Sequence, residues 1–199
     1  MKKIETIWHY LLWSALEKRE FKHTQQKLAQ EFDYSLSTIN YALFIPSQMG
    51  AIRKESKFFV LQDFFKLLYY WASLRNLNKD LIYQTYVKET TSEIEGLVPP
   101  ESVYAGYSAA RRILDEPPAD YAQIHLYFPQ KLLTKIQARF PANRDQIPNL
   151  FVFKLSPIME RYGKISTLAQ TFVDIWNLKD WYSHDFTKAL EEKIRGILS

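Results

Sequence analysis

The stretch from "HTQQKLAQEF" to "KFFVL" holds two short helical patterns joined by a tight turn, and it constrains the fold more than any other part of the sequence. Thr24 stands at an N-cap position, because its hydroxyl can accept a hydrogen bond from the first turn of a helix over "QQKLAQEF". The residues "DYS" form the turn, and Ser35 can cap the next helix in the same way. In that second helix, apolar residues at helical spacing place Ile39, Ala42 and Leu43 on the inward face. The pattern predicts a helix-turn-helix.

A basic hairpin pattern follows the second helix. Pro46 is expected to end that helix by the preceding residue, because proline lacks the N–H and restricts the residue before it. Gly50 permits the bend into "AIRKESKFFVL", where "KES" separates two β-prone runs. Helical spacing from Ile4 to about Lys18 and in "QDFFKLLYYWASLRN" predicts a further helix on either side. This is the element order of a winged helix-turn-helix, which we place in residues 1–76.

The second half of the chain alternates strand and helix patterns. "VYAGYSAARRIL" predicts a short strand that turns into a helix around Gly106 and Ser108. "YAQIHLYF" predicts a strand in which Ile124, Leu126 and Phe128 alternate with more polar positions, and "NLFVFKL" predicts a buried strand. "PQKLLTKIQARF", "STLAQTFVDIWNL" and "DFTKALEEKIRGIL" have helical patterns, the first with proline in its first turn. The pattern indicates a mixed α/β domain.

These patterns together predict an α+β protein with two domains. Residues 77–98 are polar and rich in turn-forming residues, and we expect them to be a linker or interdomain segment. Residues 99–199 would then form the mixed α/β C-terminal domain.

Charge is concentrated in the first half of the chain. Residues 1–88 carry 13 Lys and Arg against 8 Asp and Glu, a net charge of +5, whereas residues 89–199 carry 13 against 14, a net charge of −1. A polyanionic partner would therefore be expected at the first half. The chain has no cysteine, and Glu5, His9 and Glu17 interrupt its first apolar run. We expect a cytoplasmic protein with no membrane partner.

The expected DNA contacts lie on the outward side of the second helix, in the hairpin and at the start of the first helix. Asn40 can contact adenine bidentately, and hydroxyl groups beside it can contact phosphates. Cations in the hairpin would lie along the phosphate backbone or a minor groove, and the first helix can add contacts through its N-terminus. The predicted DNA-binding residues are Gln25, Gln26, Lys27, Ser35, Ser37, Thr38, Asn40, Tyr41, Arg53, Lys54 and Lys57.

One alternative follows from what the second helix lacks. It contains neither Arg nor Lys, although bidentate arginine to guanine is the commonest base-specific contact. A winged helix can also serve as a protein-interaction module, and in that case the C-terminal half would neutralise a partner without specific DNA binding. Arg111 and Arg112, on a predicted helix, are candidates for a partner-binding patch, with a surface salt bridge as the simpler explanation.

Two parts of the sequence resemble known families. Residues 24–61 resemble the winged-helix domains of bacterial and archaeal transcription regulators. The segments "VYAGYSAARRIL", "QIHLYFPQKL", "IPNLFVFKL" and "AQTFVDIWNL" resemble the AbiEi-type antitoxins of type IV toxin–antitoxin systems. The resemblance implies a DNA-binding domain that represses its own operon and a C-terminal domain that counters a nucleotidyltransferase-like toxin. Its implied partners are double-stranded operator DNA and that toxin.

Catalysis has weaker support in the sequence. "AGYSAARRIL" followed by "YAQIHLYF" faintly resembles a nucleotidyltransferase, in which a Gly-Ser turn precedes a strand with two carboxylates for Mg²⁺. Gln123 and His125 occupy the equivalent strand, and neither is a carboxylate. We therefore predict a non-catalytic domain, and a degenerate relative of the nucleotidyltransferase fold is one form that it could take. His184 with Asp180 and Asp185 could bind a metal, but a solvated helix start explains them more simply, and we predict no metal or cofactor.

Overall fold

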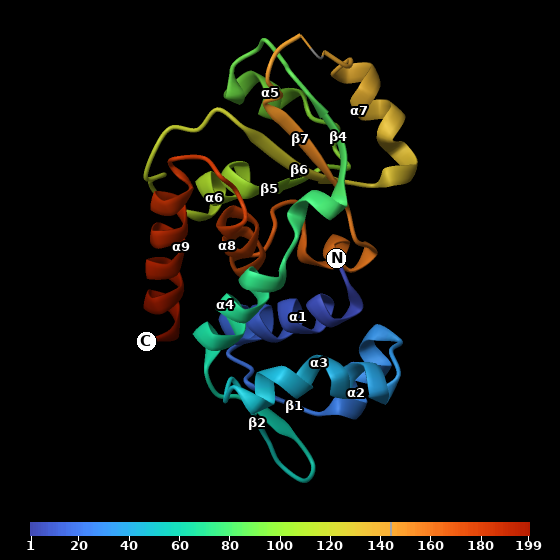
Figure 1. Ribbon diagram of the computed structural model, residues 1–199, viewed down its shortest axis with the longest axis vertical. Helices are drawn as coiled ribbons and strands as arrows, with labels where there is room; N and C mark the ends of the chain where they lie inside the picture. Colours follow the sequence, from blue (N-terminus) through green and yellow to red (C-terminus); the bar gives the residue numbers. More distant parts are fainter. Residues whose placement is uncertain (144) are drawn as a thin grey trace. The chain divides into compact units, whose positions relative to one another are not determined.

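The protein is an α+β protein, which confirms the fold class expected from the sequence (Figure 1). A computed structural model describes residues 1–143 and 145–199. The chain divides into two compact units, one formed by residues 1–75 with 197–199 and the other by residues 76–196. Within the described residues, no helix is both long and apolar enough to span a bilayer.

The first unit packs helices against a small antiparallel sheet. Helices α1, α2, α3 and α4 span Lys3–Lys18, Gln25–Phe32, Leu36–Gln48 and Phe64–Leu74. The three-stranded sheet has the order β1-β3-β2, with bounds Lys22–His23, Ile52–Lys54 and Phe59–Leu61 for β1, β2 and β3. The helices and the β2–β3 hairpin were predicted, whereas β1 was not. Helix α1 contacts both α3 and α4, and its buried side chains form the centre of this unit's core.

The local signals at the start of α2 and α3 act as expected. Thr24 Oγ1 accepts a hydrogen bond from the backbone N–H of Lys27 at 3.1 Å, and Ser35 Oγ accepts one from Thr38 N–H at 3.1 Å. These caps satisfy N–H groups that have no partner within the first turn of a helix. The three side chains predicted to face inward from α3 are fully buried, namely Ile39, Ala42 and Leu43.

The prediction that Pro46 ends α3 is wrong, because the helix continues to Gln48. Proline cannot donate the hydrogen bond that the carbonyl of Ala42, four residues earlier, would normally accept. The buried indole of Trp8 in α1 supplies the missing donor, with 2.7 Å between Trp8 Nε1 and Ala42 O. A side chain from another helix thus satisfies the carbonyl, and the helix can pass through the proline.

The second unit is built on a mixed four-stranded sheet of order β4-β7-β6-β5, with β6 and β7 parallel and the outer pairs antiparallel. Strands β4, β5, β6 and β7 span Leu81–Thr85, Val103–Ala105, Ile124–Phe128 and Leu150–Lys154. Helices α5, α6, α7, α8 and α9 span Thr91–Leu97, Gly106–Ile113, Leu133–Arg139, Leu168–Trp176 and Ser183–Leu198. Short 3₁₀ turns cover Leu77–Asp80, Gln130–Leu132 and Pro157–Tyr162.

The two faces of this sheet are covered differently. One face packs a mainly aliphatic core, which also contains Phe128 and Phe140, with Ile94 of α5 and Ile136 of α7. The opposite face carries aromatic side chains and His125. The His125 ring contacts Tyr107 of α6, and Tyr127 Oη donates to Asp174 Oδ2 of α8 at 2.6 Å. Since both faces are buried, all five residues of β6 are buried, and the predicted alternation of buried and polar positions is wrong in its polar half.

Residues 77–98, predicted as a linker or interdomain segment, hold β4 and α5. Strand β4 forms an edge of the sheet by pairing with β7, with Thr85 opposite Leu150. Helix α5 starts with a capping box in which Thr90 and Glu93 satisfy each other's backbone N–H groups. The polar composition of this segment reflects an edge strand and a half-exposed helix.

The role of Trp8 can be tested with a double-mutant cycle. Trp8→Phe removes the indole N–H and leaves the Ala42 carbonyl without that donor, which should lower the free energy of unfolding by about 1–3 kcal/mol. In a Pro46→Ala background the new backbone N–H can donate to the same carbonyl, so Trp8→Phe should cost measurably less there. Urea denaturation followed by far-UV circular dichroism measures both costs. An equal cost in the two backgrounds would contradict the proposed exchange of donors.

Candidate functional site

The outward face of α3 presents a mixture of polar and apolar side chains. Ser37, Asn40 and Tyr41 are exposed as predicted, with Tyr41 71% exposed. The hydroxyl groups of Ser35 and Thr38 are 2.9 Å apart and share a hydrogen bond at the start of the helix. Ser35 is thus first a cap, and its hydroxyl is already engaged.

A hydrogen bond connects this face with the hairpin. Lys54 Nζ, at the end of β2, donates to Asn40 Oδ1 at 2.9 Å. An ammonium group can only donate, so the amide oxygen must be the atom beside Lys54, and this fixes the orientation of the Asn40 amide. The carbonyl oxygen retains a second lone pair, and the amide nitrogen keeps both of its donors.

The hairpin that carries Lys54 is short and regular. Arg53 lies opposite Val60 in the ladder, and the loop closes through a hydrogen bond from Glu55 N–H to Phe58 O at 2.8 Å. Arg53 Nε lies 3.5 Å from Glu55 Oε1, an exposed ion pair whose contribution to stability is small. Lys57 projects from the exposed loop.

A groove of about 530 Å³ brings the start of α2, the start of α3 and the hairpin loop together. It contains three of the predicted residues that are far apart in sequence, Gln25, Gln26 and Lys57. Lys27 is exposed beside them, with its ammonium 3.5 Å from Glu20 Oε1. The groove is lined by Thr24, Gln25, Gln26, Leu36, Glu55, Ser56, Lys57 and Phe58.

Sequence reasoning missed several members of this surface. Lys22 of β1 holds its ammonium 3.9 Å from the centroid of the Phe58 ring, which adds a cation beside the hairpin loop. Phe44 and Ile45 are 50% and 40% exposed on α3. Once Ile39, Ala42 and Leu43 were assigned inward, helical periodicity already placed Phe44 on the outward side. No pattern in the sequence indicated that Lys22 would lie beside the hairpin.

Chemically, this surface suits contact with a phosphate backbone and the edges of bases. Its helix offers an amide, hydroxyls and apolar groups, and the adjoining hairpin offers Arg53, Lys54 and Lys57 as cations. Helix N-termini, hydroxyls and lysines are common phosphate ligands, and amides read base edges.

In the second unit, both predicted partner-binding arginines have side-chain contacts within the unit. Arg112 is held internally: its Nη1 lies 2.9 Å from Glu95 Oε2 and donates to Ser108 O at 2.7 Å, and its guanidinium lies 3.7 Å from the centroid of the Tyr104 ring. This arginine fixes α6 against α5, which explains it without a partner. Arg111 is exposed.

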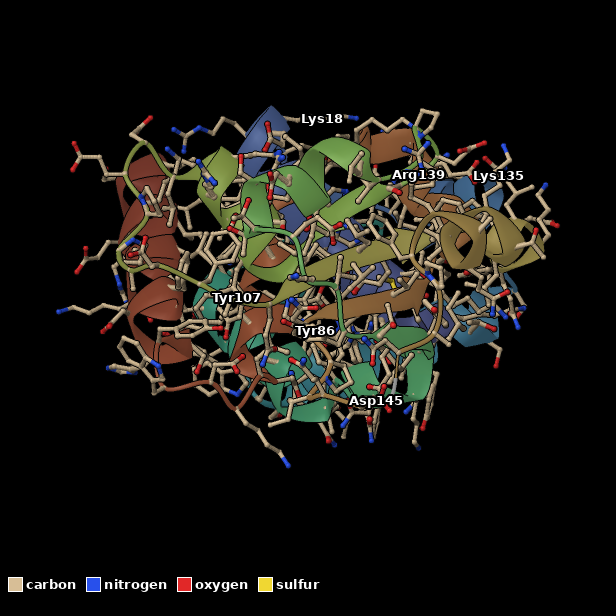
Figure 2. The ribbon with its side chains drawn as sticks, turned by 90° about the horizontal axis from the view of Figure 1, so that it is seen from above. Lys18, Tyr86, Tyr107, Lys135, Arg139 and Asp145 are labelled. Atoms are coloured by element: carbon tan, nitrogen blue, oxygen red, sulfur yellow. The ribbon has the colours of Figure 1, made fainter. Side chains whose placement is uncertain are left out.

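The strand positions compared with nucleotidyltransferase carboxylates have structural contacts. Gln123 Nε2 donates to Asp180 Oδ1 at 2.7 Å, and Tyr107 Oη donates to Asp180 Oδ2 at 2.9 Å. Figure 2 shows Tyr107 beside α9, where its ring lies 5.0 Å from that of Phe186. Across residues 1–143 and 145–199, no three His, Cys, Asp or Glu side chains are grouped so that they could hold a metal ion. Asp180 connects Gln123 and Tyr107 within the second unit by accepting a hydrogen bond from each.

His125 lies in an aromatic layer. Its ring is nearly parallel to those of Phe151 and Phe153, at 5.3 and 6.0 Å, and its Nδ1 has no hydrogen-bond partner among the described residues. Burial lowers the pKa of His125 to about 3. Gly106 packs against the same ring, and a Cβ there would lie 2.9 Å from His125 Nδ1. With a φ of +50° as well, this position requires glycine.

Comparison with protein-family models, with curated proteins and with solved structures found no match for this chain.

The buried imidazole predicts how stability depends on pH. His125 is neutral in the folded protein but titrates near pH 6.5 when unfolded, so the unfolded state binds the extra proton between pH 6.5 and about 3. Stability should be complete above pH 6.5 and fall as the pH drops, by at most about 1.4 kcal/mol per pH unit from this residue. His125→Leu should flatten that dependence, measured by urea denaturation between pH 7.5 and 4.5. Identical slopes in the two proteins would contradict the assignment.

Proposed function

We propose that the chain binds double-stranded DNA through α3 and the β2–β3 hairpin. The observation that carries this proposal is the hydrogen bond between Lys54 and Asn40, which places a hairpin cation beside a polar side chain suited to reading a base edge. Under this proposal, α2 and α3 with the turn between them form a helix-turn-helix, α3 enters the major groove, and the hairpin is the wing.

The charge distribution supports this proposal. The net charge of +5 lies in residues 1–88, and Lys22, Arg53, Lys54 and Lys57 all lie in the sheet or hairpin next to α3. Phosphate contacts from these cations would supply most of the affinity, so binding should weaken steeply as salt increases. The N-terminus of α2, with Gln25, Gln26 and Lys27, would add contacts to the same backbone.

The biological role rests on the resemblance to AbiEi-type antitoxins. On that basis we propose a cytoplasmic regulator that represses its own operon, with a non-catalytic second unit that counters a nucleotidyltransferase-like toxin. Co-expression with a nucleotidyltransferase-like protein encoded next to this gene tests the second part: the full chain should relieve growth arrest. Growth arrest that persists in the presence of soluble full-length chain would remove the antitoxin role and leave DNA binding as a separate question.

The exposed apolar side chains of α3 favour a second candidate, a protein-interaction module. Leu36, Tyr41, Phe44 and Ile45 expose between 40% and 71% of their surface on one helix, and exposed apolar patches often mark protein interfaces. This function would require no specific DNA binding, and mutation of the hairpin lysines would leave it unchanged.

Asn40→Ala tests base reading. Loss of the amide should remove about 1–3 kcal/mol of preference for the DNA upstream of the gene over a scrambled duplex, because the base edge loses a bidentate partner. Affinity for the scrambled duplex should stay within a factor of about two, since phosphate contacts remain. Fluorescence anisotropy with both duplexes measures this, with Gln30→Ala, an exposed residue of α2, as the control. An unchanged preference in Asn40→Ala would show that this face does not read bases.

Replacing Lys54 and Lys57 by alanine tests the wing. The double variant should bind both duplexes more weakly, and the slope of log K against log salt should flatten by about 2. The upstream duplex should lose somewhat more affinity than the scrambled one, because Asn40 also loses its contact with Lys54. Lys131→Ala with Lys188→Ala is the matched control, because it removes two exposed cations from the second unit. Equal effects from the two double variants would indicate a general charge effect and contradict a specific wing.

A further inference from the structure

We propose that α3 reads A·T base pairs, with Asn40 contacting adenine and the apolar residues on either side of it contacting thymine methyl groups. This inference rests on the proposed DNA-binding function and specifies the sequence class that the interface recognises.

The row of side chains on α3 has a regular geometry. Leu36, Asn40 and Phe44 are spaced four residues apart, so they lie one above another on the same side of the helix. Leu36 and Phe44 are each 50% exposed, and Asn40 is exposed between them. Tyr41, 71% exposed, widens the row on one side. If α3 lay along a groove, Leu36 and Phe44 would make apolar contacts with base pairs on either side of the pair that the Asn40 amide contacts.

This combination of groups matches one kind of base pair. In the major groove an A·T pair presents the N7 acceptor and amino donor of adenine together with the C5-methyl group of thymine. An asparagine amide can satisfy both polar atoms of adenine, and apolar side chains contact the methyl group favourably. The sequence of α3, "LSTINYALFIPSQ", has no Arg or Lys to read guanine and no Asp or Glu to accept from cytosine. The helix itself therefore discriminates in favour of A·T pairs.

The contact with Lys54 prepares Asn40 for this role. Because Lys54 donates to the amide oxygen, the orientation of the Asn40 amide is fixed, and its nitrogen can donate a hydrogen bond to adenine N7. The second lone pair of the oxygen can accept from the adenine amino group while Lys54 stays bound. Preorganisation of this kind reduces the entropy lost on binding.

Charge complementarity identifies DNA as the occupant of this apolar row. The neighbouring hairpin carries Arg53, Lys54 and Lys57, and Lys27 is exposed on α2. These cations would meet the phosphates that border a major groove while the row meets the base edges. A protein partner is the competing occupant, and the experiment below distinguishes it.

The test begins by selecting binding sites for the full-length chain from a randomised duplex pool. The selected sequences should share a run of A·T pairs. In the best site, every thymine of that run is then replaced by deoxyuridine, which removes only the C5-methyl groups. Affinity should fall by about fourfold for each methyl group in contact with α3, the value expected for one buried methylene group.

A variant links this loss to the helix. Leu36→Ala combined with Phe44→Ala should bind the thymine and uracil duplexes equally, while the slope of log K against log salt stays as in the parent. Both side chains are half-exposed, and circular dichroism verifies that the variant is folded. Gln30→Ala is the control and should retain the full preference for thymine.

Three results would overturn the inference. Selected sites rich in G·C pairs would show that Lys54, and not the apolar row, dominates readout. Equal affinity for thymine and uracil duplexes, with salt-sensitive specific binding intact, would refute methyl recognition while leaving DNA binding in place. No enrichment of any sequence, and no binding at low salt, would refute the proposed function as well and assign the apolar row to a protein partner.

Discussion

The hydrogen bond from the Trp8 indole to the Ala42 carbonyl allows α3 to continue past Pro46 to Gln48. Without that donor, Pro46 would leave an unsatisfied carbonyl in the buried side of the helix. Because α3 runs on to Gln48, its last turn sets where the hairpin begins, and Ala51 N–H donates to Pro46 O at 2.9 Å. The hairpin in turn brings Lys54 to Asn40. The buried contact on one side of α3 and the polar contact on the other are thus connected through the last turn of the helix and the start of the hairpin.

The second unit is organised by the burial of its sheet on both faces. Polar side chains such as Gln123 and Tyr107 donate hydrogen bonds to Asp180. His125 is neutral and lies within an aromatic layer. Arg112 is likewise used to hold Glu95 and Tyr104. These contacts hold the strands and helices of the second unit together.

Local signals in the sequence were sufficient for part of this structure. The caps at Thr24 and Ser35 and the inward face of α3 depend on residues within one or two turns, so spacing alone revealed them. The continuation of α3 through Pro46 depends on a donor 34 residues away, and the pairing of β4 with β7 depends on a strand much later in the chain. Neither leaves a local pattern. The contact between Lys54 and Asn40 was hidden for the same reason, although both residues had been selected as candidates.

The most direct test of the central claim is the affinity of the unmodified chain for the DNA upstream of its gene, against a scrambled duplex of equal length, across a range of salt concentrations. We predict tighter binding to the upstream duplex and a steep loss of affinity for both duplexes as salt increases. Equal affinity for the two duplexes would reduce the surface of α3 and the hairpin to a merely basic one. Absence of binding even at low salt would contradict the claim outright.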